Sequence, residues 1–185
     1  MADRQIALIR GINVGRAKRV EMASLRELFS GLGYSNVSTL LNSGNVVFTA
    51  PRGAGRRAEA RIEEAFVTRF GFSARVTVLA AAELARVVVE NPLGERAADP
   101  SRLLVTILNK PEDRARLAPL AQQDWNPDVL AIGARAAYLW CAQGILSSSL
   151  AEAVSRVLGD AATSRNWSTV TKLHALVEQP AKTGP

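Results

Sequence analysis

Apolar and polar positions along the first 80 residues alternate between two patterns. Four short apolar runs rich in β-branched side chains predict strands, at residues 5–12, 37–41, 46–49 and 75–79. Between them, apolar residues recur at helical spacing and predict helices at residues 22–32 and 62–70. Asn42-Ser43-Gly44-Asn45 separates two strands and is typical of a hairpin. The predicted order is β-α-β-β-α-β, the split-βαβ arrangement.

The second half repeats this order of patterns. Residues 82–90 predict a bridging helix that ends before Asn91-Pro92. Further strands are predicted at residues 103–108, 129–132, 137–141 and 161–164, and further helices at 111–120, 150–158 and 167–177. No convincing residue-level repeat accompanies this order, so the duplication rests on the pattern alone.

These patterns predict an α+β protein made of two ferredoxin-like (split-βαβ) halves with antiparallel or mixed sheets. We expect a first domain at residues 1–80 and a second at residues 103–178, which includes the C-terminal helix. Residues 81–102 form the linking helix and loop between them, and residues 179–185 form a polar tail.

Positive charge is concentrated in the first half. Residues 1–80 contain 12 Lys and Arg against 6 Asp and Glu, a net charge of +6, whereas residues 81–185 contain 11 of each. A basic half favours an anionic partner such as a nucleic acid, a nucleotide or a phosphorylated metabolite. The alternative is compositional, because a sequence rich in arginine and alanine can carry this charge without any partner.

The composition argues against several classes of protein. Cys141 is the one cysteine and His174 the one histidine, which excludes an internal disulfide framework and a Cys/His zinc cluster. No apolar run approaches the ~20 residues of a membrane span. The first residues lack the apolar core of a signal peptide. We therefore expect a soluble cytoplasmic protein that binds no membrane, no metal and no cofactor.

The common catalytic motifs are also missing. The glycine spacing matches neither a Walker loop nor a dinucleotide fingerprint, and Ser43 lacks the flanking glycines of a nucleophile elbow. His174 lies near the apolar stripe of the last helix, so we expect a packed or rim histidine rather than a catalytic one. Cys141 alternates with Leu139 on one strand face, so we expect a buried, inert thiol. Phe48 is the one aromatic residue on the central strands of the first half, which argues against the stacking mode of RNA-recognition motifs.

Three segments carry a family resemblance: Leu8-Ile9-Arg10-Gly11-Ile12-Asn13-Val14-Gly15, Ser43-Gly44-Asn45-Val46-Val47-Phe48 and Thr163-Ser164-Arg165-Asn166-Trp167-Ser168-Thr169-Val170. In order and spacing they resemble the signatures of the bacterial family called domain of unknown function 1697, over nearly the whole chain. The resemblance implies a pair of ferredoxin-like domains, and it implies no activity, since none is established for the family. Arg16 is a departure, because relatives often have a second glycine there.

The predicted topology places a candidate site at one end of the first sheet. The first two strands of a split-βαβ unit run parallel, so the loop after the first strand and the hairpin after the second share one end. We expect these candidate ligand-binding residues to meet there: Arg10, Asn13, Arg16, Lys18, Asn42, Ser43 and Asn45. The adjoining helix start favours an anion, and Ser24 with Glu27 is predicted to cap it. The alternative is turn architecture, in which asparagine and glycine only supply unusual backbone angles.

Two further polar groups are candidates. One is a basic patch at the front of the second helix, formed by Arg52, Arg56, Arg57 and Arg61, which is either a solvated face or a contact for phosphates. The other is formed by Arg165, Asn166 and Lys172 around the last helix. Asn166 or Ser168 is the expected N-cap of that helix, and Arg165 is expected to reach the first site if the two halves fold face to face.

Two functions stay open at this point. The first is a binding module for an anionic, phosphorylated ligand or a nucleic acid, which the uneven charge and the missing nucleophile–base pair favour. The alternative is a small cytosolic enzyme whose polar site contains Arg10, Asn13, Ser43, Asn45 and Lys172. A closed, charged pocket at the loop–hairpin end would favour the enzyme. The sequence predicts neither the ligand nor the oligomeric state.

Overall fold

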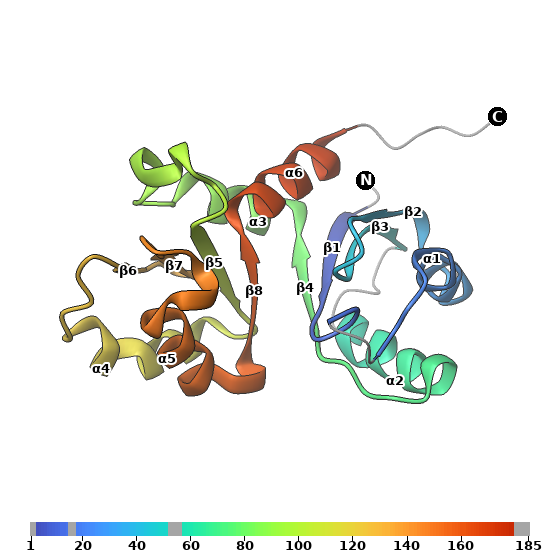
Figure 1. The fold of residues 1–185 in the computed structure, drawn as a ribbon. Helices are drawn as coiled ribbons and strands as arrows, with labels where there is room; N and C mark the ends of the chain where they lie inside the picture. Colours follow the sequence, from blue (N-terminus) through green and yellow to red (C-terminus); the bar gives the residue numbers. More distant parts are fainter. Residues whose placement is uncertain (1–2, 15–17, 52–56, 180–185) are drawn as a thin grey trace. The chain divides into compact units, whose positions relative to one another are not determined.

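The computed structural model describes residues 3–14, 18–51 and 57–179 (Figure 1). The chain divides into two compact units. The first unit contains the residues up to Leu84 together with the segment from Leu173, and the second contains Ala85–Lys172. Each unit has a four-stranded antiparallel sheet with helices, which confirms the predicted α+β fold with two ferredoxin-like halves.

The first unit follows the predicted order of elements. Its strands are β1 (Asp3–Ile9), β2 (Ser35–Leu40), β3 (Asn45–Ala50) and β4 (Val76–Ala80), and its crossover helices are α1 (Met22–Gly31) and α2 (Ala58–Phe70). The sheet order is β2-β3-β1-β4, and all neighbours are antiparallel. Helix α2 ends at Gly71, whose φ of +76° is left-handed and costs glycine little, as the sequence predicted.

Apolar side chains at helical spacing hold α1 on the sheet. Leu25, Leu28 and Phe29 are the buried residues of this helix. They belong to one core cluster with Phe48 of β3, and the rings of Phe29 and Phe48 lie 5.2 Å apart edge to face. Each such buried side chain stabilises the unit by about 1.5–3 kcal/mol, so the core fixes where α1 begins relative to the sheet.

The second unit repeats the architecture. Its strands are β5 (Leu103–Leu108), β6 (Val129–Ile132), β7 (Ala136–Trp140) and β8 (Ala162–Asn166). The sheet order is β6-β7-β5-β8, again antiparallel throughout. Helix α5 (Ser149–Leu158) belongs to this unit, whereas α3 (Ala81–Val89) and α6 (Trp167–Glu178) contribute residues to both units.

The first crossover of the second unit differs from its prediction. Residues 111–120 were expected to form an α-helix, but they form the 3-10 helix η3 (Pro111–Leu117) followed by the four-residue helix α4 (Ala118–Ala121). Pro119 has no N–H to donate to the carbonyl four residues earlier, so a regular α-helix cannot continue through it.

Two predictions at the candidate site need correction. The first strand ends at Ile9 rather than residue 12. Beyond it, Gly11 and Asn13 have φ values of +72° and +55°, which depart from the extended backbone of a regular strand. The predicted capping of the following helix is wrong. Helix α1 begins at Met22, its N-cap is Glu21, and no side chain caps it.

Candidate functional site

The loop after β1 and the β2–β3 hairpin meet at one end of the first sheet, where the sequence predicted the site. The Ile9 N–H donates to the Gly44 carbonyl at 2.8 Å, and Asn13 Nδ2 donates to the Asn42 carbonyl at 2.7 Å. Gly44 permits this approach: its φ is +78°, and a Cβ there would lie 2.8 Å from the Ile9 oxygen. Only glycine fits without a shift of the backbone.

Asn13 and Asn45 hold this end together. Besides its bond to the hairpin, Asn13 Nδ2 donates to the Val20 carbonyl at 2.9 Å, and Asn13 Oδ1 accepts the Val20 N–H at 2.8 Å. Asn45 is completely buried, and its Nδ2 donates to the Leu40 carbonyl and to Ser43 Oγ, both at 2.9 Å. These hydrogen bonds are the ones that turn architecture requires.

The backbone at this end is strained. Asn13, Lys18 and Leu41 have φ values of +55°, +54° and +57°. In the described part of the chain, Asn36 is the one other non-glycine residue with positive φ. Each such residue costs about 1–2 kcal/mol. Strain of this kind collects at ligand clamps and active sites, where the surrounding structure holds it in place.

A depression of about 450 Å³ opens beside the start of α1. It is lined by Asn13, Arg19, Val20, Glu21, Met22 and Asn42. The N–H groups of Met22, Ala23 and Ser24 have no hydrogen-bond partner among the described residues. Together with the helix dipole, they place about half a positive charge at this end of the helix.

Arg19 adds a full positive charge to the depression. Its side chain is exposed and makes no hydrogen bond or ion pair within the part of the chain that the structure describes. Glu21, also exposed, supplies a negative charge at the same rim. Arg19 is not among the candidate residues predicted from the sequence, where its one signal was its position just before a predicted helix.

The other predicted cations of this end lie at its margin. Arg10 is half-buried just beyond β1, and its N–H donates to the Arg75 carbonyl at 2.9 Å. Lys18 is exposed, with its ammonium 5.8 Å from the centroid of the Phe72 ring, a cation–π contact. Arg16 lies outside the described residues.

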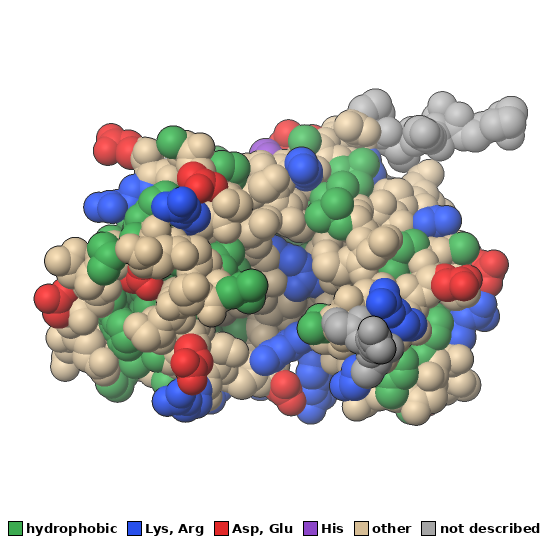
Figure 2. All heavy atoms as spheres, viewed as in Figure 1, with side chains coloured by type: hydrophobic (Ala, Val, Ile, Leu, Met, Phe, Trp, Pro, Cys, Tyr) green, Lys and Arg blue, Asp and Glu red, His purple; other side chains and the backbone are tan. Residues whose placement is uncertain are grey.

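The predicted basic patch is partly engaged in packing. Arg61 donates to the Leu32 carbonyl at 3.2 Å, and its guanidinium lies 5.9 Å from the Tyr34 ring, so it ties α2 to the chain after α1. Arg57 is exposed and makes no hydrogen bond or ion pair within the described residues, while Arg52 and Arg56 lie outside them. In the view of Figure 2, the Lys and Arg side chains of the first unit, on the right, stand at several separate places.

Arg165, Asn166 and Lys172 belong to the second unit. Asn166 Oδ1 accepts the Thr169 N–H at 2.9 Å, which is the N-cap role predicted for it. Arg165 donates to the Ser164 carbonyl at 2.8 Å. Burial lowers the pKa of Arg165 to about 10, so this side chain is still positively charged at neutral pH. Lys172 is exposed.

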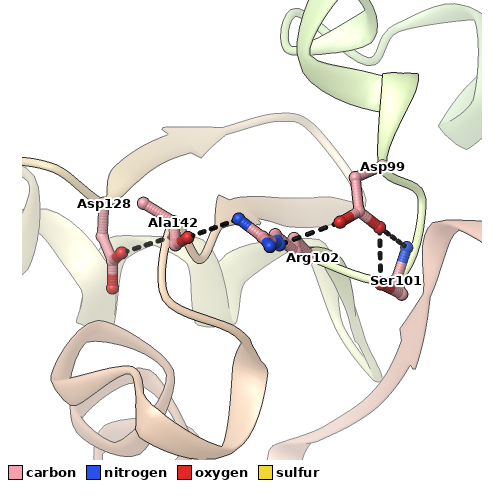
Figure 3. Close-up of polar contacts among 5 residues, drawn as sticks. All are labelled: Asp99, Ser101, Arg102, Asp128 and Ala142. Atoms are coloured by element: carbon pink, nitrogen blue, oxygen red, sulfur yellow. Dashed lines mark hydrogen bonds and ion pairs between the residues drawn. The ribbon is translucent and has the colours of Figure 1, made fainter.

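The structure also contains a polar network in the second unit that the sequence did not reveal (Figure 3). Arg102 pairs with Asp99 at 2.8 Å and donates to the Ala142 carbonyl at 2.8 Å. Asp99 accepts two hydrogen bonds from Ser101, which lower the pKa of its carboxyl group. Arg102 therefore joins two loops that lie 40 residues apart in sequence.

Asp128 extends this network on the other side of Ala142. Its Oδ1 accepts the Ala142 N–H at 2.8 Å, and its Oδ2 accepts the Ser148 hydroxyl at 2.6 Å. Ser148 Oγ in turn accepts the Ala151 N–H and caps α5. Both carboxylate oxygens are engaged within the unit, which is the behaviour of a structural network.

Cys141 is buried as the sequence predicted, and His174 is half-buried on α6. Cys141 is completely buried, and burial raises the pKa of its thiol, which opposes nucleophilic chemistry. His174 Nε2 lies 3.3 Å from Glu178 Oε1, one turn further along α6. Among the described residues, no three side chains gather as metal ligands, and no helix has the length and apolar character to span a membrane.

Comparisons with known proteins agree with this fold. A family model described as "Protein of unknown function (DUF1697)" matches residues 2–138. The chain is also similar to the structure of conserved bacterial protein SP0830 from Streptococcus pneumoniae, with a TM-score of 0.79 and 22% sequence identity. That match covers 96% of this chain and 100% of the other. No curated protein matches the sequence.

Proposed function

The chain belongs to the DUF1697 family, and we propose that it is a binding module for a phosphate-bearing anion, either a small molecule or a nucleic acid. The proposed site is the depression beside the start of α1. The observation that carries the proposal is the meeting there of an uncapped helix start with Arg19, which has no partner within the described residues.

The chemistry of these groups suits a phosphate. Free N–H groups at a helix start point toward an anion and stabilise it through the helix dipole. An arginine can hold two phosphate oxygens at once, and a hydrogen bond to a charged group contributes about 1.5–3 kcal/mol. The hydrogen bonds between Asn13 and the Val20 backbone hold the chain beside the helix start in place before a ligand arrives. Glu21 opposes an anion unless its exposed carboxylate turns toward solvent.

Several features support binding over catalysis. An enzyme at this end would need a nucleophile and a base within hydrogen-bond reach of each other. Ser43 Oγ is held by Asn45, and Asn13 uses its side-chain amide within the loop and hairpin. Among the described residues that line the depression, Glu21 is the one carboxylate. The proposal does not depend on Arg165, Asn166 or Lys172.

Calorimetric titration tests this function. The ligands are inorganic phosphate, pyrophosphate, a nucleoside monophosphate, and short single-stranded and duplex oligonucleotides, each at low salt. Arg19→Ala is expected to weaken the binding of whichever ligand binds by about tenfold or more. Arg114→Ala is the matched control, because the Arg114 side chain is also exposed and makes no hydrogen bond or ion pair in the described part, but belongs to the second unit.

The salt dependence separates the two ligand classes. Binding of a nucleic acid should weaken steeply with salt, because each neutralised phosphate releases counterions, whereas a small phosphate compound should respond weakly. If none of the ligands binds wild-type protein at low salt, the proposed function is wrong. Equal losses of affinity in the Arg19 and Arg114 variants would instead show that the ligand binds outside the depression.

A further inference from the structure

Outer strands of the first sheet are protected from pairing with another strand. On β4, the N–H groups of Val76, Val78 and Ala80 donate to glutamate carboxylates at 2.8–3.0 Å. The acceptors are Glu63 and Glu59 of α2 and Glu83 of α3. These carboxylates occupy the positions that a further strand would need, so they block the edge of β4.

The opposite edge of this sheet is protected in another way. Strand β2 is polar over much of its length, and its register against β3 shifts between Ser35 and Ser38. Within the shift, Asn36 has a φ of +50°. A bulge of this kind twists an edge away from regular pairing, and natural proteins use it against association between sheets.

Strand β6 of the second sheet has neither form of protection. It is an outer strand with the apolar sequence Val-Leu-Ala-Ile, and its register with β7 is regular throughout (Figure 1). Because Gly133 donates to Ala136, the antiparallel alternation points the N–H and C=O groups of Leu130 and Ile132 away from β7. These groups have no hydrogen-bond partner among the described residues.

We propose that the outer edge of β6 is the docking surface for a second copy of this chain. Two β6 strands would pair antiparallel about a two-fold axis at Ala131. Leu130 of each copy would then face Ile132 of the other, which forms about four hydrogen bonds and joins the two second-unit sheets into one. This docking surface lies outside the depression of the first unit and does not depend on the proposed function.

Two features favour a second copy over another partner. The small side chain of Ala131 would meet its own copy at the axis, where directly opposed Cβ atoms lie only about 4.5–5.5 Å apart. The second unit, residues 85–172, contains 10 Lys and Arg against 9 Asp and Glu, a net charge of +1, so self-association through it meets less charge repulsion than association through the basic first half. A four-residue edge buries less than the roughly 1,200 Å² of a stable interface, so the dimer is expected to be weak.

Sedimentation velocity over a protein concentration of about 10 µM to 1 mM tests this surface, because a weak dimer dissociates within that range. The wild-type chain should shift from monomer to dimer as its concentration rises. Ala131→Lys and Ala131→Glu should each weaken the dimer by about tenfold or more, since like charges would oppose each other at the axis. An equimolar mixture of the two variants should restore the dimer, because opposite charges then meet.

Ala134→Lys is the matched control. Ala134 is exposed in the β6–β7 turn, so this variant gains the same charge outside the paired strand and should dimerise like wild type. Circular dichroism checks that each variant is folded. A wild-type chain that is monomeric over the whole range overturns the proposal. So does a dimer that neither Ala131 variant weakens, or a mixture of folded variants that stays monomeric.

Discussion

The two units have the same strand order, yet they close the corresponding end of their sheets differently. In the first unit the last residue of β1, Ile9, donates to the carbonyl of Gly44, just before β3. In the second unit the last residue of β5, Leu108, donates to the carbonyl of Arg135, just before β7. The carbonyl that accepts this hydrogen bond therefore belongs to a glycine in the first unit and to an arginine in the second.

This exchange changes what each end can do. Arg135 Nη1 donates to the Asn109 carbonyl at 2.7 Å, so the hairpin cation of the second unit clamps its own loop. In the first unit Asn13 does the clamping, and Arg19 keeps its charge available. All four non-glycine residues with positive φ in the described chain also belong to the first unit. The comparison teaches that topology determines where the loop and the hairpin of each sheet meet. Individual side chains determine whether the cation there is hydrogen-bonded within the unit or stays available.

The largest expected effect comes from separating the units. Residues 85–172 form the second unit without a break, whereas the first unit also includes Leu173 and Val177 of α6, both almost fully buried. Expressed alone, residues 85–172 should fold cooperatively. Residues 1–84 should keep the split-βαβ structure. Compared with the same unit in the whole chain, the fragment should be less stable by about 3–6 kcal/mol, which is what burial of two apolar side chains contributes. Urea denaturation followed by circular dichroism measures both, and a fragment 1–84 as stable as 85–172 would contradict this division.

The second effect tests the close approach at Gly44. Gly44→Ala should destabilise the protein by about 3 kcal/mol or more. The new Cβ would clash with the Ile9 carbonyl, and alanine is strained at this positive φ. Gly71→Ala is the control: Gly71 has nearly the same φ, +76°, but open space around it, so about 1 kcal/mol is expected. Thermal denaturation gives both values. Equal losses would show that Gly44 supplies only backbone freedom.

The third effect is an alkaline pH dependence that Tyr138 gives the second unit. The Tyr138 hydroxyl donates to the Val87 carbonyl at 2.8 Å, and burial, with a contribution from Glu90, raises the pKa of Tyr138 to about 12. The pKa of Tyr138 in the folded protein lies above its unfolded value near 10. The stability that the buried, protonated hydroxyl contributes is therefore complete below pH 10 and is lost as the pH rises to 12. The loss should be about 2–3 kcal/mol.

Tyr138→Phe should flatten this alkaline loss in denaturation curves measured from pH 8 to pH 12. Burial also raises the pKa of Tyr34 in the first unit, with Arg61 opposing the shift. Tyr34→Phe is therefore the matched control, and it should leave the contribution of Tyr138 in place. If Tyr138→Phe keeps the whole alkaline loss, the dependence arises elsewhere.

The smallest effect addresses the two cations directly. Arg135→Ala should cost about 1.5–3 kcal/mol of stability, because a charged donor to the Asn109 carbonyl is lost. Arg19→Ala should change the free energy of unfolding by less than about 0.5 kcal/mol, because its exposed side chain makes no hydrogen bond or ion pair in the described part of the chain. Thermal melts compare the two variants, and a large loss for Arg19→Ala would mean that this residue has a structural role.

Much of the architecture followed from local patterns in the sequence. The strands at residues 103–108 and 129–132 and the start of the last helix at Trp167 have the predicted bounds, because their apolar periods are regular and turn residues flank them. The meeting of the loop with the β2–β3 hairpin was also predictable, since the parallel arrangement of the first two strands requires it.

The sequence could not determine with which partner each polar group forms a hydrogen bond. Ser24 and Glu27 have the spacing of a capping box, yet packing of Leu25, Leu28 and Phe29 starts α1 at Met22 and leaves its first N–H groups uncapped. Arg19 and Arg135 look alike in the sequence, but one is free within the described residues and the other is a clamp. Periodicity records neighbours within a few residues along the chain, whereas a hydrogen bond across tens of residues exists only once the tertiary structure has brought its two ends together.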